Sequence, residues 1–299
     1  RVLWANQVMT AKSLYLQLQY DQMLLVRVQS GRGDMERIHE IVKNREALGG
    51  YPAGTSREIE IRLLALDEDV RALKALIADE VSVLGIMLGY GATARVQIDP
   101  VELVDFEQHT PVRYDDYEKR VLNASSEIRQ FYYLENAARQ VRREVSFSIF
   151  GVSTLSRGVA SGVFDNVPIQ DGLGFGTAAS IKISKAQVQT IALQRQGVAE
   201  TLKRQLMQAV TNYNLDIANY PGVKKRVSLA KAVNEQLFER LRLGGDVDML
   251  NLLEGSRNYI QAGTSKLNAQ IRFLRNQDKI FRLALTSDYS GDPLSGRKP

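Results

Sequence analysis

The chain has 299 residues, a formal charge of +5 at pH 7 and 44% hydrophobic residues, of which few are aromatic. It has no cysteine and only two histidines, which excludes disulfides and thiolate chemistry and leaves no Cys/His pattern for a metal. Lys and Arg are interspersed with Asp and Glu, which indicates solvated helix faces and not a nucleic-acid surface. We therefore expect no catalytic residue, no cofactor, no metal and no nucleic-acid partner.

Residues 1–100 are predicted to form a helical hairpin. A helix over 2–48, interrupted or kinked near Gly31–Gly33, ends at a loop rich in turn residues over 49–54. A second helix begins at Thr55 or Ser56, and its apolar positions step alternately by four and three, the period of a left-handed coiled coil. Those positions are Ile59, Leu63, Leu66, Val70, Leu73 and Ile77.

Residues 101–144 are predicted to be a linker and a long helix. The segment 90–112 contains Pro and Gly and is expected to be irregular, and the helix runs from about Arg113 to Glu144. Its apolar residues again follow the four-three spacing, so we expect it to pack along a neighbouring helix.

Residues 145–184 are predicted to form a small β-hairpin between helices. From Val145 to Thr154, β-branched and aromatic residues nearly alternate with small ones. In the second half, Leu173, Phe175, Ile181 and Ile183 would share one strand face. No apolar run approaches the roughly 18 to 20 residues of a membrane-spanning helix, so any contact with a bilayer core would need such strands.

Residues 185–286 are predicted to form a second helical hairpin. Its first helix is expected to break or bend at Tyr220-Pro221-Gly222 and to end at Leu243. The turn Gly244-Gly245-Asp246 then reverses the chain, and the last helix carries apolar residues at a seven-residue step. A disordered tail is expected over 287–299. The predicted fold class is mainly α, with two repeats of long coiled-coil hairpins.

The two hairpins align with each other. Setting Gly54 against Gly244 places Leu63 on Leu253 and Ile77 on Leu267, so the apolar positions of the two helices coincide. A shift to Gly245 would pair Glu60 with Asn251 but lose that match, and the alignment stays open. We predict a structural duplication.

One segment of the second hairpin is similar to a known family. Residues 240–254 read Arg-Leu-Arg-Leu-Gly-Gly-Asp-Val-Asp-Met-Leu-Asn-Leu-Leu-Glu: an arginine-bearing helix, a glycine turn, and then a run resembling acid-Val-Leu-acid. This order resembles the second repeat of the TolC-like outer-membrane channels of efflux and type I secretion. Asn251 stands where the first acid is common and Glu254 where the second acid stands. The order of elements over most of 1–286 is also similar.

This resemblance implies a homotrimer in the outer membrane of a Gram-negative bacterium, with most of its mass in the periplasm. The β-hairpins of three copies would close one barrel in the lipid bilayer, and the helices would form a tunnel. The turns would meet a periplasmic adaptor that is joined to an inner-membrane transporter. Implied adaptor contacts are Gly50, Gly54, Gly244, Gly245, Asp246 and Asp248, and Asn251 and Glu254 would line the tunnel entrance.

Other interpretations remain open. Since the family has two strand hairpins per subunit, a first helix and hairpin would precede Arg1. Val247 stands where some members carry a basic residue that holds the entrance shut, so no arginine-to-acid gate is expected. Asp246 and Asp248 could equally do no more than stabilise the helix dipole from its first turn. Glu254 could equally be a solvated helix position. The rival function is a non-pore coiled-coil scaffold of the periplasm or cytosol. A periplasmic adaptor is disfavoured because the predicted strands lie between two hairpins.

Overall fold

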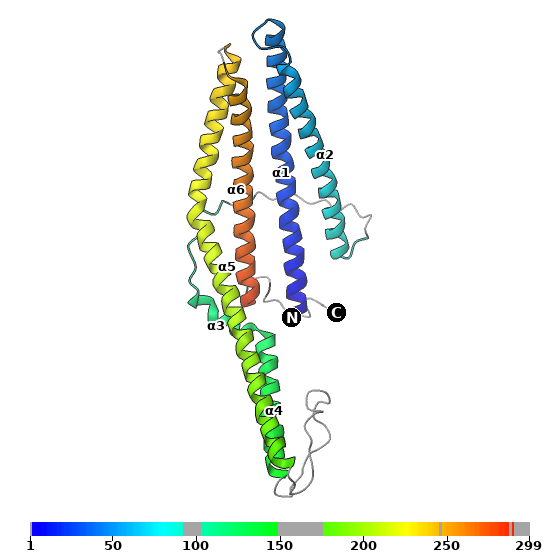
Figure 1. The fold of residues 1–299 in the computed structure, drawn as a ribbon, viewed down its shortest axis with the longest axis vertical. Helices are drawn as coiled ribbons and strands as arrows, with labels where there is room; N and C mark the ends of the chain where they lie inside the picture. Colours follow the sequence, from blue (N-terminus) through cyan, green and yellow to red (C-terminus); the bar gives the residue numbers. More distant parts are fainter. Residues whose placement is uncertain are drawn as a thin grey trace, which may run out of the picture.

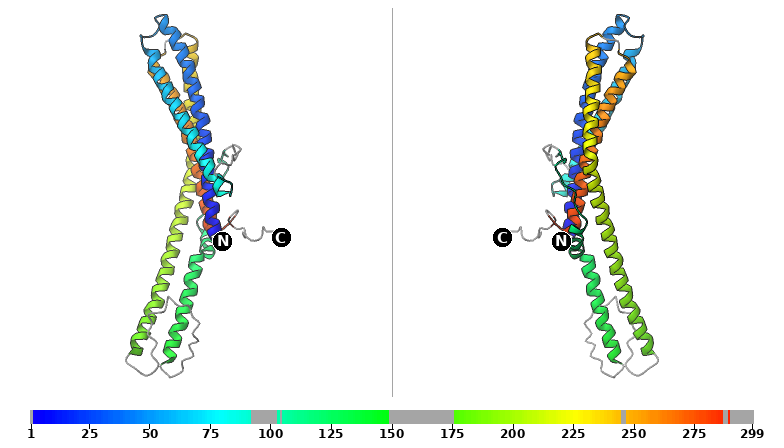
Figure 2. Two further views of the ribbon diagram at one scale, coloured as in Figure 1. Left: turned by 90° about the vertical axis from the view of Figure 1, so that its right-hand side faces the viewer. Right: turned by 90° about the vertical axis from the view of Figure 1, so that its left-hand side faces the viewer.

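A computed structural model describes residues 2–91, 103, 105–148, 176–244, 247–286 and 289, and these form six helices and no strand. The helices are α1 (Val2–Ala47), α2 (Thr55–Met87), α3 (Asp115–Ala124), α4 (Ser126–Ser148), α5 (Gly176–Arg242) and α6 (Met249–Ala284). The molecule is long and narrow (Figure 1). The hairpins α1–α2 and α5–α6 lie side by side in one half, and α4 accompanies the first part of α5 in the other (Figure 2).

The two predicted helical hairpins are confirmed, and they form one row of helices. α2 packs on α1, α1 packs on α6, and α6 packs on α5. The turn between α1 and α2 and the turn between α5 and α6 both lie at the same end of the molecule, which we call the tip (Figure 1). The C-terminal end of α4 and the N-terminal end of α5 lie at the opposite end. The row therefore has two outer helices, α2 and α5.

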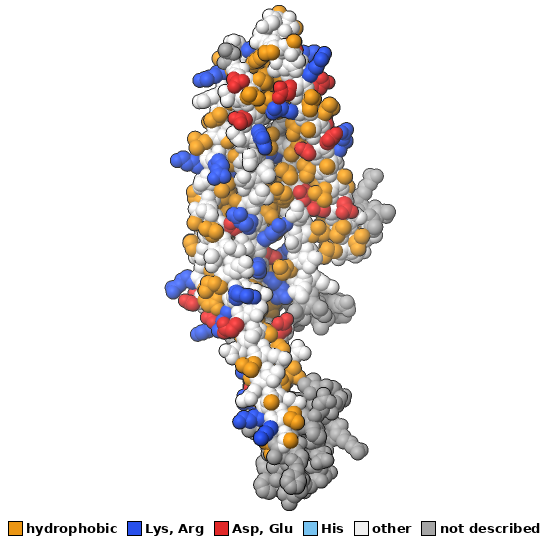
Figure 3. Space-filling model, in the orientation of Figure 1, with side chains coloured by type: hydrophobic (Ala, Val, Ile, Leu, Met, Phe, Trp, Pro, Cys, Tyr) orange, Lys and Arg blue, Asp and Glu red, His pale blue; other side chains and the backbone are white. Residues whose placement is uncertain are grey.

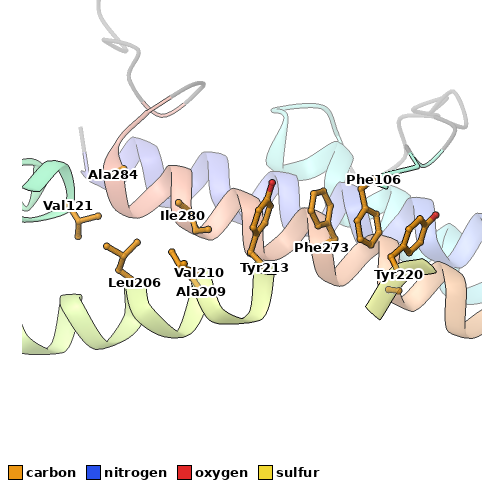
Figure 4. Packing of buried hydrophobic residues seen from close by; sticks show 11 residues of the cluster. Phe106, Val121, Leu206, Ala209, Val210, Tyr213, Tyr220, Phe273, Ile280 and Ala284 are labelled. Atoms are coloured by element: carbon orange, nitrogen blue, oxygen red, sulfur yellow. The ribbon is translucent and has the colours of Figure 1, made fainter. Parts of the chain in front are cut away.

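A buried aromatic stack fastens the segment before α3 to the second hairpin. The ring of Phe106 stacks between those of Tyr220 and Phe273, with centroids 3.8 and 4.0 Å away (Figure 4). The main chain of Val112 and the side-chain amide of Asn214 exchange two hydrogen bonds of 2.9 Å. This irregular segment is thus a fixed part of the fold, although it forms no helix between residue 105 and Tyr114.

The predicted β-hairpin over 145–184 is wrong at both ends. Residues 145–148 complete α4, and residues 176–184 are the first part of α5. The buried positions Ser184, Val188 and Ile191 continue a helical spacing, whereas Ile183, assigned to a strand face, is exposed. Val188 and Ile191 pack on Ala138 of α4, and this packing favours a helix over the strand that the short alternation of apolar residues suggested. The middle of the predicted hairpin, 149–175, lies outside the described residues, as do all residues of the predicted tail (287–299) except 289.

Three further boundaries differ from the prediction. α1 runs through Gly31 and Gly33 without interruption. α5 runs through Pro221 without a break, although it changes direction near its middle (Figure 2). A proline in a helix costs about 3 kcal/mol. Tyr220, the residue before it, is fully buried in the aromatic stack and fixes the helix there to α6. The helix expected from Arg113 to Glu144 is divided at Ser125, which is extended and whose hydroxyl accepts from the Ile128 amide.

Candidate functional site

The turn after α1 is closed by the last residues of that helix. Gly54 has φ 98°, which favours glycine, and it immediately precedes α2. The carboxylate of Glu46 accepts from the amides of Gly54 at 2.5 Å and Ser56 at 2.8 Å, and these hydrogen bonds lower the pKa of Glu46. Gly50 is exposed and donates its amide to the Arg45 carbonyl at 2.8 Å. The first turn is therefore a fixed loop that presents backbone to solvent.

The turn after α5 has a similar plan. Gly244 has φ 85°, and its position is exposed. Asp248 is the N-cap of α6, where its carboxylate accepts from the Leu250 amide at 3.2 Å. This is the helix-stabilising role that the sequence left open for this acid. Gly245 and Asp246 lie outside the described residues.

Beneath the two turns, the four helices of the row share one apolar cluster. Ile38 and Val42 of α1 meet Ile59 of α2, Leu241 of α5 and Leu252 of α6 there, all fully buried. Val247, which stands where some channels of the resembled family carry a basic residue, is also in this cluster and is 3% exposed. The tip is therefore one packed unit and not two separate hairpin ends.

Two side chains of the first hairpin also bind the main chain of the second. The guanidinium of Arg45 donates to the carbonyl of Leu241, and the hydroxyl of Tyr51 donates to the carbonyl of Val247 at 3.2 Å. Sequence reasoning missed both residues. The available signal was weak: an arginine in the last turn of a helix and an aromatic residue in a polar turn.

The residues predicted at the tunnel entrance share one solvent-exposed face of α6. Asn251 and Glu254 are exposed, one turn apart, while Leu252 and Leu253 between them are buried in the tip cluster. Together with Gly50, Gly54, Gly244 and Asp248, the structure places them all at or near the tip. The adaptor contacts and the entrance role stay predictions.

Both outer helices of the row carry an unpartnered apolar stripe. On α2 the exposed hydrophobic residues recur at helical spacing, and side chains of this kind gather over α2 on the face in Figure 3. They are Ile61, Leu64, Leu76, Val83 and Ile86. On α5 the stripe runs for most of the helix and comprises Ile183, Leu193, Met207, Leu215, Leu229 and Val233. Isolated apolar residues are normal on a protein surface, but each of these stripes contains several along one face of a helix.

In the described part of the chain, acidic and histidine side chains nowhere form a group of three that could hold a metal ion. None of the helices in this part combines the length and the apolar character needed to cross a bilayer.

Known structures share this fold. The outer-membrane channel OprN superposes with a TM-score of 0.76 and 16% identity, covering 95% of this chain and 66% of that one. The outer membrane protein VceC of Vibrio cholerae gives 0.74 and 14%, covering 94% and 70%. The Neisseria gonorrhoeae outer membrane channel MtrE, solved in its open state, gives 0.68 and 13%, covering 94% and 66%.

These similarities confirm, at the level of the fold, the resemblance predicted from residues 240–254 and the order of elements. The chain spans about two thirds of the length of the channels that it matches. No family model and no curated protein sequence matches it.

Proposed function

We propose that this chain, which has the fold of TolC-family outer-membrane channels, is a subunit of a homotrimeric channel for efflux or protein secretion. One observation carries the proposal: the helices α2, α1, α6 and α5 form a row whose two turns share one end and whose two outer helices each carry an exposed apolar stripe. A tunnel wall built from such rows needs no catalytic group.

Several copies can close into a ring through the two outer helices. The stripe on α2 and the stripe on α5 are different surfaces, so contact between them is head-to-tail, and head-to-tail contacts close rings when the rotation permits. α2 carries seven acidic and four basic residues, whereas α5 carries eleven basic and four acidic residues. Opposite charge flanking two apolar stripes favours pairing of unlike outer helices.

The α5 side also offers a groove for the neighbouring helix. Leu229 and Val233 of α5 and Gly255 and Ala262 of α6 line an open groove of about 630 Å³. Small residues on α6 let a partner helix approach closely. In the proposed trimer, α2 of one copy lies against α5 of the next. The end of the molecule at which α4 ends and α5 begins faces the outer membrane, and the tip extends into the periplasm.

The tip supports docking of a periplasmic adaptor that is coupled to an inner-membrane transporter. Leu48 and Leu243, each directly before a glycine turn, are 87% and 78% exposed. Large apolar side chains this exposed at the end of a molecule mark an interaction surface. Gly50, Gly54, Gly244, Gly245, Asp246 and Asp248 would supply backbone and charge around the two leucines. In the trimer, Asn251 and Glu254 would face the entrance.

Oligomeric state and conductance test the channel. The full chain, purified in detergent, should be a trimer by native mass spectrometry and should form ion-conducting pores in planar bilayers. Leu229→Glu should reduce the trimer fraction, since it places an acid against the acidic α2. Lys231→Glu is the control, because it changes the charge of α5 more but lies outside the stripe. A monomer without conductance would instead favour the non-pore scaffold.

A photo-crosslinking amino acid tests the tip. Placed at Leu243 in intact cells, it should give an adduct with a periplasmic helical-hairpin protein, identified by mass spectrometry. The same probe at Leu193, exposed on the side of α5, should not. Adducts of equal yield at both positions would contradict docking at the tip.

A further inference from the structure

Two polar contacts of opposite character lie along the contact between α1 and α2, which we call the seam. Nearer the tip, Arg32 of α1 forms an ion pair with Asp67 of α2. Farther from the tip, Asp21 of α1 faces Glu80 of α2, and both carry acidic side chains. One half of the seam is thus joined by unlike charges and the other by two carboxyl groups.

The acidic contact is buried. Asp21 is 3% exposed and Glu80 is 9% exposed, and Glu80 Oε2 has no hydrogen-bond partner among the described residues. Asp21 accepts from Gln17 Nε2 at 2.8 Å, and Gln17 Oε1 in turn accepts from Arg275 of α6 at 2.6 Å. An amide therefore separates the arginine from the acidic pair.

Two buried carboxyl groups at hydrogen-bonding distance are stable when they share a proton. Burial is the largest cause that raises the pKa of Glu80, followed by the charge of Asp21 and its hydrogen bond, and the result is a pKa of about 7. Asp79 on the same helix adds a further negative charge in the same direction. Loss of the shared proton leaves like charges in a site shielded from water, which is unfavourable.

We propose that Asp21 and Glu80 form a proton-dependent latch that holds the C-terminal half of α2 against α1 and releases it as the pH rises through neutrality. The proposal concerns a single subunit and does not depend on the channel function. Glu80 binds its proton more tightly when the seam is closed than when it is open. The closed seam therefore loses stability as the pH rises from the ordinary pKa of a glutamate to about 7.

The ion pair limits the release to one half of α2. The hydrogen bond from Arg32 lowers the pKa of Asp67, so this contact stays charged across the range in which Glu80 titrates. The tip cluster holds the same half of the seam. The half that is released carries Leu76, Val83 and Ile86, the distal part of the exposed stripe of α2. The pH therefore acts on part of an outer face of the row.

Amide hydrogen exchange of the full chain, corrected for the intrinsic pH dependence of exchange, tests the latch. Protection of residues 76–87 should fall about tenfold between pH 6 and pH 8, as linkage predicts for a pKa near 7 in the closed seam. Protection of residues 56–67 should not change. Glu80→Gln keeps a hydrogen-bond donor for Asp21 and cannot ionise, so its protection should be the same at both pH values. Glu68→Gln, at an exposed position of α2, should behave like the unaltered chain.

Two results would overturn the proposal: protection of 76–87 that does not vary with pH in the unaltered chain, or a pH dependence that persists in Glu80→Gln. If Glu80→Gln does not fold, Asp21→Asn decides. Removing the charge of Asp21 should move the loss of protection to lower pH, and an unmoved transition would also overturn the latch.

Discussion

The guanidinium of Arg45, in the last turn of α1, donates a hydrogen bond to the main-chain carbonyl of Leu241, in the last turn of α5. This contact joins the two hairpins where their helices end. Any movement that separates the hairpin ends at the tip must break it.

Arg45→Met should loosen the tip. A hydrogen bond from a charged donor contributes roughly 1.5–3 kcal/mol when buried, and since Arg45 is half-exposed we expect a loss of about 1 kcal/mol in the free energy of unfolding. The urea midpoint measures it, and amide exchange of residues 236–242 should quicken. Lys43→Met, at an exposed position two residues earlier, is the matched control. Equal effects of the two substitutions would show that the contact to Leu241 contributes nothing.

Tyr51→Phe tests the second link between the hairpins. It removes the hydroxyl that donates to the Val247 carbonyl at 3.2 Å and keeps the ring in the tip cluster. The expected loss is about 1 kcal/mol. Tyr90→Phe, at an exposed tyrosine beyond α2, should change nothing. In a double-mutant cycle with Arg45→Met, the two losses should be non-additive, because both links hold the same pair of helix ends.

Two glycines of α1 should respond differently to alanine. A Cβ at Gly31 would overlap the end of the Ile260 side chain on α6, whereas at Gly33 it would meet no atom of the described residues within 4 Å. Gly33→Ala should stabilise the chain by roughly 0.5–1 kcal/mol, the usual difference between the two residues within a helix. Gly31→Ala should stabilise it less or destabilise it, because the end of the Ile260 side chain must move. Thermal unfolding compares them directly, and equal stabilisation by both would refute the close contact of α1 and α6.

Glu254→Gln tests the proposed entrance. If three copies of Glu254 surround it, their negative charge favours cations, and the substitution should lower the cation-to-anion permeability ratio. The reversal potential in a KCl gradient measures that ratio. Glu58→Gln, at an exposed position near the start of α2, should leave it unchanged. A reversal potential that is insensitive to residue 254 would place Glu254 outside the conduction path.

The helical hairpins could be predicted because their signals are repeated many times. The apolar residues from Ile59 to Ile77 repeat one period several times, and Thr55, one of the two predicted starts of α2, is the observed one. The strand prediction over 145–184 failed because alternation over a few residues is a short signal. Ser184, a polar residue on the buried face, concealed the helical stripe that continues to Val188 and Ile191.

The links at the tip could not be predicted, for a different reason. Arg45 and Tyr51 each bind a carbonyl 196 residues farther along the chain. Every residue has a main-chain carbonyl, so no residue type marks the acceptor. Only the packing of the two hairpins selects Leu241 and Val247.

That choice of acceptor affects how the tip can change during evolution. A carbonyl persists whatever side chain replaces Leu241 or Val247, provided that the new residue still fits the apolar cluster. Among related sequences, Arg45 and Tyr51 should therefore be retained without compensating exchanges at positions 241 and 247. Methods that infer contacts from correlated substitutions would overlook these two hydrogen bonds, even though they connect the two hairpins of the chain.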